Sequence, residues 1–213
     1  MNAPAQLHEV TPQTVEFTLD GRKVQAYAGE TILTVAKRLG IEIPHLCYKE
    51  GYRPDGNCRA CVVEIKGERT LAPSCCRSAS AGMEVHSQSP RARKSQQMVL
   101  EMLLADMPDT GYKWNDDVAA GAATGAAPAL GQHGELSQWA ARAGVTVRPA
   151  LKALRREQPA PDVSHPAMAV NLDACIQCTR CVRACRDEQV NDVIGLAFRG
   201  QDTKIVFDQD DPM

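Results

Sequence analysis

The sequence is poor in aromatic residues and carries no excess charge of either sign. Phenylalanine, tryptophan and tyrosine make up 4% of the 213 residues, and the formal net charge is −2. Few aromatic rings leave little surface on which nucleic-acid bases can stack, and a near-neutral chain has no positive field to attract phosphates or anionic lipids. The expected partners therefore include no nucleic acid and no membrane.

Long apolar runs are missing too. No stretch approaches the roughly 18 consecutive apolar residues of a membrane-spanning helix, and the opening residues MNAPAQLHEV lack the basic and apolar regions of a signal peptide. We therefore expect a cytoplasmic location. Hydrophobic residues still make up 44% of the chain, which is enough to build a buried core.

Cysteine is abundant. The chain has nine cysteines, which fall into one group at 47–76 and a second at 175–185. A reducing compartment disfavours disulfides, so metal binding is the expected use of so many thiols. The two separate groups predict two metal sites.

The first predicted domain, residues 1–88, alternates strands with one helix. Asp20–Gly21 between two alternating runs indicates a β-hairpin. Apolar residues at i, i+3, i+4 and i+7 predict a short amphipathic helix that ends at Gly40, and those residues are Ile32, Val35, Ala36 and Leu39. The predicted strands are 15–19, 22–28, 61–65 and 83–87. This order predicts an α+β domain, which we expect to be a β-grasp unit resembling [2Fe–2S] ferredoxins.

A helical and Ala/Pro-rich connector is predicted over 89–165. Ser89 and Pro90 form the start of a helix that reaches about residue 106. The composition then shifts to Ala, Gly and Pro, with one helix expected around 134–156. The last domain, 166–213, is expected to be a partial bacterial-ferredoxin-like [4Fe–4S] module, with strands at MAVNL (168–172) and near 193–198 and 203–207.

The first cysteine group has the spacing C-x10-C-x2-C-x13-C. Each iron of a [2Fe–2S] cluster takes two thiolates, so four cysteines complete the site. The C-x2-C pair can reach one iron while the outer cysteines complete the other. Glycines in the loop, Gly51 and Gly56, would let backbone N–H groups approach the sulfides. The predicted ligands are Cys47, Cys58, Cys61 and Cys75.

Zinc and inert buried thiols are the competing interpretations of this group. Structural zinc sites commonly use two C-x2-C pairs, and only Cys58 and Cys61 form such a pair here. Adjacent residues of an extended segment face opposite sides, so we choose Cys75 as the ligand and expect Cys76 to be a small buried residue. His45 could act as a ligand only in a Rieske-type site, so a packing role is expected for it.

The second cysteine group spells C-x2-C-x2-C-x3-C, the run typical of bacterial ferredoxins. Its members are Cys175, Cys178, Cys181 and Cys185. The first three predict ligands of a [4Fe–4S] cluster. Cys185 either completes the same cluster or serves another one, and the geometry of the run favours the second alternative. Arg186 follows where two-cluster ferredoxins have proline. The chain would then be the front portion of a longer protein.

Three motifs resemble the N-terminal region of the catalytic (alpha) subunit of cytosolic NAD-dependent molybdenum or tungsten formate dehydrogenases. They are PHLCYKEGYRPDGNCRACVVEI, PSCCR and VNLDACIQCTRCVRACRDEQVNDVIG. The large iron–sulfur subunit of complex I and the electron-transfer subunit of NAD-reducing hydrogenases have similar regions. Many relatives carry a further His-x3-Cys-x2-Cys-x5-Cys cluster after the helix at 90–106. Here Met107 stands near the expected histidine and no cysteine occurs from 77 to 174, so that cluster is expected to be absent.

The resemblance implies an electron relay. Formate would be oxidised at a bis-pterin molybdenum or tungsten centre in the remainder of the catalytic subunit, and single electrons would pass through the clusters. A partner subunit that binds FMN and NAD would collect them. No acid–base pair, Ser/His/Asp set or phosphate-binding glycine loop is recognisable, so no catalytic residue is predicted within the chain.

Two alternatives stay open. The chain could instead serve an NAD-reducing hydrogenase or a complex I-like NADH dehydrogenase. An interpretation of a different class is a zinc-stabilised interaction module, in which the connector tethers two small metal-binding folds.

Overall fold

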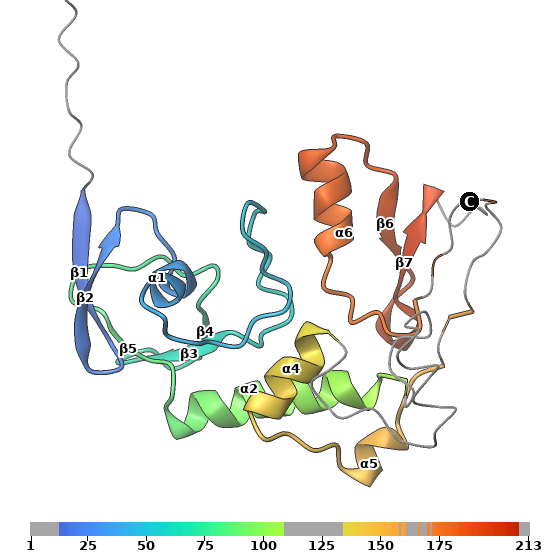
Figure 1. The fold of residues 1–213 in the computed structure, drawn as a ribbon, viewed down its shortest axis with the longest axis horizontal. Coiled ribbons are helices and arrows are strands. Elements are labelled where there is room, and N and C mark those ends of the chain that lie inside the picture. Colours follow the sequence, from blue (N-terminus) through green and yellow to red (C-terminus); the bar gives the residue numbers. More distant parts are fainter. Residues whose placement is uncertain are drawn as a thin grey trace, which may run out of the picture.

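The computed structural model describes residues 13–108, 134–157, 159–160, 166, 170 and 172–208. Figure 1 shows a sheet unit at one end, a C-terminal module at the other, and helices beneath both. The Ala/Gly-rich part of the connector, which falls within 109–133, and most of the strand predicted at 168–172 lie outside the described residues. Within the described part of the chain, no helix is long and apolar enough to cross a membrane.

The N-terminal unit is a mixed five-stranded sheet with one helix packed on it, which confirms the predicted α+β class. The strand order is β2-β1-β5-β3-β4, and β1 and β5 run parallel while the other neighbours are antiparallel. The strands are β1 (Thr14–Leu19), β2 (Arg22–Tyr27), β3 (Val62–Ile65), β4 (Ala72–Pro73) and β5 (Glu84–His86).

The predicted hairpin is present. Asp20 and Gly21 both adopt positive φ, 49° and 79°, as a tight two-residue turn between antiparallel strands requires. The Asp20 carboxylate also accepts hydrogen bonds from the backbone N–H and the hydroxyl of Ser87, at 2.7 and 2.6 Å. The turn is thereby tied to the residue that follows β5.

Helix α1 (Ile32–Arg38) packs on the sheet and supplies much of its core. Thr31 caps the helix by accepting a hydrogen bond from the Thr34 N–H, at 3.3 Å. Leu39 departs from the predicted apolar face, since it lies at the C-cap and is 42% exposed, whereas Leu33 is buried. The buried residues of this core include Phe17, Leu19, Ile32, Leu33, Val35, Ala36, Val63, Val85, Cys61 and Cys75.

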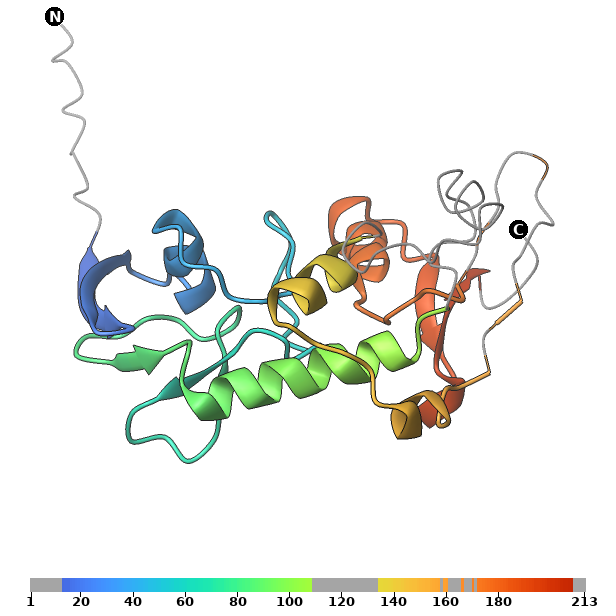
Figure 2. The same cartoon turned by 60° about the horizontal axis from the view of Figure 1, so that its bottom comes forward.

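Helix α2 (Pro90–Ala105) has the predicted start and end. Ser89 accepts a hydrogen bond from the Ala92 N–H at 3.1 Å, and Pro90 occupies the first turn. Figure 2 shows α2 running from the sheet unit toward the C-terminal module. The buried Gln96 side chain donates to the carbonyls of Val62 and Ser87, so the helix is anchored to the sheet unit.

The single helix predicted around 134–156 is wrong. The structure has α4 (Glu135–Arg142) and α5 (Pro149–Lys152), separated by an extended segment. Gly144, at φ 63°, ends the first helix, and Pro149 begins the second. Helix α4 packs on α2 in a second apolar cluster that contains Leu46, Ala60, Leu100, Leu104, Leu136 and Ala140.

The C-terminal module has little regular structure. Helix α6 (Arg180–Arg183) continues into a π-helical turn, η1 (Ala184–Glu188). Strands β6 (Ile194–Ala197) and β7 (Lys204–Phe207) form an antiparallel hairpin joined by the short 3-10 turn η2 (Gly200–Asp202), which confirms the two predicted strands. Arg186 lies inside the π-helical turn, where a proline would have removed a backbone donor.

Candidate metal centres

The four cysteines of the first group lie at one end of the sheet unit. Cys47 and Cys58 belong to the loop after α1, which Figure 1 shows between α1 and α6. Cys61 immediately precedes β3, and Cys75 follows β4 two residues after Pro73. The side chains of Cys47, Cys61 and Cys75 are buried, and that of Cys58 is partly exposed. The structure thus brings all four predicted ligands to the edge of the core.

The thiols of this group interact with one another. Hydrogen bonds from the thiols of Cys58 and Cys75 lower the pKa of Cys47 to about 2, and a hydrogen bond from Cys75 lowers that of Cys61 to about 7. The same bonds raise the pKa of Cys58, chiefly through Cys47, and that of Cys75, through Cys47 and then Cys61. The thiolate is the form that ligates metal. The lowered pKa values of Cys47 and Cys61 therefore favour the ligating form of these two thiols.

The contacts pair Cys47 with Cys58 and Cys61 with Cys75, and Cys47 also reaches Cys75. The sequence interpretation placed Cys58 and Cys61 on one iron, so the geometry favours a different pairing. Among the described residues, no group of three or more His, Cys, Asp or Glu side chains is placed so that it could hold a metal ion.

Ser74 is a buried polar neighbour of this site that sequence reasoning missed. Its hydroxyl donates to the Cys61 carbonyl at 2.7 Å, and it also contributes to lowering the pKa of the Cys61 thiol. The Ser74 N–H donates to the same carbonyl at 3.1 Å. The only signal in the sequence was a hydroxyl residue directly before Cys75. Such hydrogen bonds around ligands orient them and adjust the metal they hold.

Cys76 and Gly56 face each other on the outside of the site. Cys75 is buried and Cys76 is exposed, so the prediction that Cys76 is buried is wrong. The two residues lie in the turn after β4, where the alternation of faces along a strand does not separate them. The Cys76 sulfur lies 3.6 Å from that of Cys75. Gly56 has φ 67°, and a Cβ atom at this position would lie 2.9 Å from the Cys76 sulfur, so both the backbone conformation and this contact favour glycine.

His45 has a packing role, as expected. Its Nδ1 atom lies 2.9 Å from the Ile43 carbonyl, and its ring packs against Tyr48 and Trp139, with centroid distances of 5.8 and 5.5 Å. Burial lowers the pKa of the imidazole, which therefore stays neutral at pH 7.

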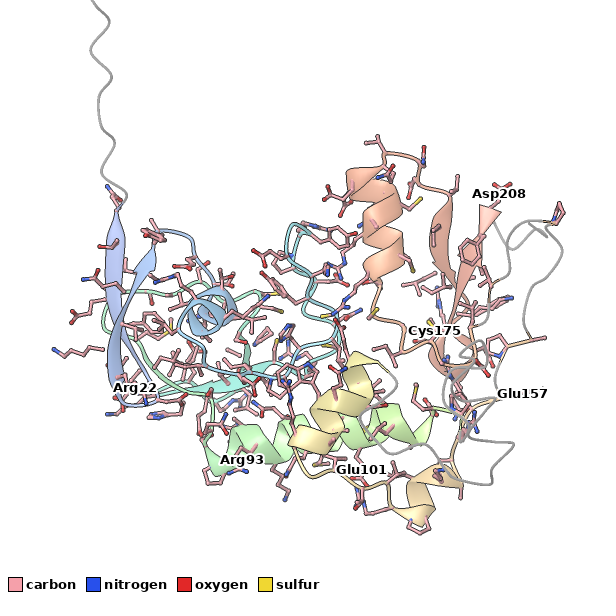
Figure 3. The ribbon with its side chains drawn as sticks, viewed as in Figure 1. Arg22, Arg93, Glu101, Glu157, Cys175 and Asp208 are labelled. Atoms are coloured by element: carbon pink, nitrogen blue, oxygen red, sulfur yellow. The ribbon has the colours of Figure 1, made fainter. Side chains whose placement is uncertain are left out.

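The second cysteine group lies in the loop before α6, in α6 itself and in the π-helical turn that follows. Figure 3 labels Cys175 near the base of the C-terminal module. Gln177 and Thr179, which alternate with the cysteines, have left-handed backbones with φ 53° and 59° and fold the loop back on itself. The Gln177 N–H points at the Cys175 sulfur, 3.4 Å away.

Burial raises the pKa of Cys175 and of Cys181, and the neighbouring charge of Cys178 raises both further. The three thiols therefore lie close enough to influence one another. Cys185 is buried in the π-helical turn and is not among the leading influences on Cys175 or Cys181. That Cys185 serves another cluster stays a prediction.

The loops that carry the two cysteine groups pack against each other. The Thr179 hydroxyl donates to the Asp55 carboxylate at 2.7 Å, and Asn57 Nδ2 lies 3.3 Å from the Gln177 carbonyl. Arg180 Nη2 donates to the Tyr48 carbonyl at 2.9 Å. The sequence showed arginines within CTRCVRAC, but nothing local indicated that they would reach residues more than a hundred positions away.

Comparisons with known proteins agree with this geometry. Residues 12–90 match the family described as 2Fe-2S iron-sulfur cluster binding domain. The chain is 32% identical to the mitochondrial NADH-ubiquinone oxidoreductase 78 kDa subunit of Candida albicans, across 90% of this chain and 25% of that protein. It is 34% identical to NADP-reducing hydrogenase subunit HndD of Solidesulfovibrio fructosivorans, across 86% of this chain and 30% of that protein.

A solved structure shares the fold. A chain in the crystal structure of NAD+-reducing [NiFe]-hydrogenase in the H2-reduced state aligns with a TM-score of 0.69 at 28% identity, covering 91% of this chain and 74% of that chain. This chain spans less than a third of the length of the two curated relatives above, at 25% and 30%. Its iron–sulfur region is homologous to those of complex I and NAD(P)-reducing hydrogenase subunits.

Proposed function

We propose that the chain is an electron-transfer segment of an NAD(P)-linked oxidoreductase complex. In this proposal Cys47, Cys58, Cys61 and Cys75 hold a [2Fe–2S] cluster, and Cys175, Cys178 and Cys181 hold a [4Fe–4S] cluster. The observation that carries the proposal is the direct contact between the two cysteine-bearing loops, through Asp55–Thr179 and Tyr48–Arg180. Two redox groups in contacting loops of one chain are suited to passing electrons onward.

The residues present suit these groups. Four interacting thiols, three of them buried, form an all-sulfur donor set, which iron–sulfur clusters require. Backbone N–H groups point at sulfur in both sites, from Cys47 to Cys58 at 3.5 Å and from Gln177 to Cys175 at 3.4 Å. When bound, the clusters would accept and release single electrons. The chain's part is to bury them, supply hydrogen bonds and set their separation.

A hydrogenase or a complex I-like NADH dehydrogenase is the complex best supported, because the relatives and the solved structure carry those names. The partner in either case would be a subunit that binds flavin and NAD. A formate dehydrogenase is the second candidate, and it rests on the three cysteine-bearing motifs quoted above. Co-purification separates the candidates, since a nickel–iron subunit favours hydrogenase and a molybdenum or tungsten pterin subunit favours formate dehydrogenase.

Iron and acid-labile sulfide in protein isolated without oxygen test the cluster proposal. We expect about six irons and six sulfides per chain, together with visible absorbance and paramagnetic resonance signals after reduction. A C61S variant should lose about two of the irons and a C178S variant about four. Colourless protein that contains zinc would overturn the proposal and support the interaction module, because zinc has no redox chemistry.

A further inference from the structure

Arg183 is a buried cation whose hydrogen bonds, within the part of the chain that the structure describes, all go to neutral oxygens. Its side chain, in α6, is among the largest fully buried groups of the protein, and the residue is 2% exposed. Nη1 donates to the Arg53 carbonyl at 2.7 Å, and Nε lies 3.4 Å from the Thr179 hydroxyl. Nη2 donates to the carbonyl of Cys47 and, at 3.3 Å, to that of Cys178.

Nearby arginines differ from Arg183 in having carboxylate partners. Arg180 pairs with Glu135 at 2.5 Å, and Arg186 pairs with Asp187 at 2.8 Å. The charge of Arg183 contributes to lowering the pKa of Asp187, yet the hydrogen bond of that carboxylate goes to Arg186. A buried charge is costly unless an opposite charge compensates it. The four hydrogen bonds of Arg183 give each of its three nitrogens a partner but do not neutralise its charge.

Its position indicates where the compensating charge would come from. Cys47 and Cys178 belong to different cysteine groups, and a single nitrogen of Arg183 donates to the backbone of both. Iron–sulfur clusters ligated by thiolates are anionic, and each added electron increases their negative charge. A cation fixed between two such groups stabilises the reduced form of each, and the low polarity of a buried site strengthens the effect.

We propose that Arg183 is a positioning residue that joins the two cysteine loops and serves as the shared counter-charge of both clusters. This inference rests on the proposed function. It assigns Arg183 two effects: it raises both reduction potentials, and it forms a continuous hydrogen-bonded connection from the Cys47 carbonyl to the Cys178 carbonyl. Both effects act on the same pair of sites.

Redox titration of the intact, cluster-loaded protein, followed by paramagnetic resonance, tests the proposal. In R183Q we expect the reduction equilibrium of each cluster to become less favourable by about tenfold, which corresponds to 59 mV for one electron. R183K keeps the charge, so both equilibria should stay within about threefold of the wild type. R180Q is the matched control: it also removes a hydrogen bond between the loops, but from a cation already paired with Glu135.

Several outcomes would overturn the proposal: unchanged potentials in R183Q, a shift of one cluster alone, or an equal shift in R180Q. If R183Q does not bind its clusters, R183K serves as the test. Failure of this charge-retaining variant to bind the clusters, or to keep both reduction potentials, would refute the role of Arg183 as a counter-charge.

In fully reduced wild type we expect a magnetic interaction between the two clusters. Two simply additive paramagnetic resonance signals would refute the proposed connection through Arg183. Wild type that binds no iron refutes the proposed function instead.

Discussion

The two cysteine sites differ in how much of their geometry the protein builds before any metal arrives. The first lies at the edge of a five-stranded sheet, and Cys61 and Cys75 belong to its hydrophobic core. The second lies on a loop followed by a four-residue helix, a π-helical turn and a two-stranded hairpin. Packing in the sheet core therefore positions the ligands of the first site, while the loop of the second is held by hydrogen bonds to other segments, such as Thr179–Asp55 and Arg180–Tyr48.

The pKa values of the thiols differ between the groups in one respect. Contacts among the first group lower the pKa of Cys47 and Cys61, to about 2 and about 7, while they raise that of Cys58 and Cys75. In the second group burial raises the pKa of Cys175 and Cys181, so those thiols stay protonated at neutral pH. If a cluster binds in the second site, its binding energy would contribute directly to folding there. We infer from this comparison that the packed core preforms the first site, whereas the second site would depend on its proposed cluster and on the first loop.

Removing single ligands should produce the largest effects and can break this comparison. C178S should lose the [4Fe–4S] signal and also increase amide hydrogen exchange across 172–208, because the module loses its metal. C61S should lose the [2Fe–2S] signal while the sheet keeps most of its protection. C185S is the control, and we expect it to retain both signals. Equal loosening of both regions in C61S and C178S would contradict the comparison.

Removing both clusters from the intact protein is the next test. After chelation under reducing conditions, amides of β1, β3 and β5 should keep slow exchange, because their core does not depend on metal. Amides of β6 and β7 should exchange much faster. The measurement is hydrogen exchange by mass spectrometry, before and after reconstitution. A C-terminal hairpin that remains protected without metal would show that the second site is also preformed.

A glycine pair can sharpen the description of the first loop. G51A places a side chain at φ 88° with nothing within 4 Å, and should cost about 1 kcal/mol of unfolding free energy. G56A meets the Cys76 sulfur at 2.9 Å as well, and should cost about 1 kcal/mol more. Urea unfolding of the two variants measures the difference. The double variant G56A/C76A should remove the additional cost, and its persistence would show that the contact does not matter.

The smallest expected effect concerns the helical layer beneath both regions. Glu101 of α2, labelled in Figure 3, accepts two side-chain hydrogen bonds from Arg148, at 2.7 and 3.0 Å, and a third from its backbone N–H at 3.0 Å. These bonds hold the pKa of the Glu101 carboxyl below its usual 4.5. The stabilisation is therefore complete above that value and is lost as the pH falls through the lowered folded-state pKa.

We expect E101Q to lower the thermal unfolding midpoint slightly at pH 7 and to match the wild type once the pH lies below the folded-state pKa. E42Q is the control, because it breaks the more exposed Glu42–Arg142 pair and should change less at either pH. If the difference in unfolding midpoint between E101Q and the wild type instead grew as the pH fell, the ionised Glu101 carboxylate would not be the stabilising form, and the prediction would be refuted.

Local spacing predicted most of the elements correctly. The Asp20–Gly21 hairpin, the cap and proline of α2 and the two C-terminal strands all depend on residues that are neighbours in the chain. One error concerned the helix predicted around 134–156. The wider pattern predicted a single helix, but Gly144 ends α4 and Pro149 begins α5. Leu39 matched the apolar period but lies at the helix end, where the face turns away from the core.

Long-range contacts could not be predicted in the same way. Cys76 turned out to be exposed although its sulfur lies 3.6 Å from that of the buried Cys75, and only the packed fold decides which of two adjacent cysteines is covered. Ser74 and Arg183 make their contacts with residues 13 and 136 positions away. No periodicity or spacing encodes such distances, because they depend on how finished elements pack.

The sequence by itself determined the chemistry of this protein: the number and grouping of its thiols, and so the prediction of two iron–sulfur sites. Tertiary structure alone decided which thiols contact each other, how strongly their pKa values shift and where a buried arginine lies between the two groups. The physical reason is that ligand identity is a property of each residue. Burial and electrostatic coupling, in contrast, depend on which distant segments come together in the folded chain.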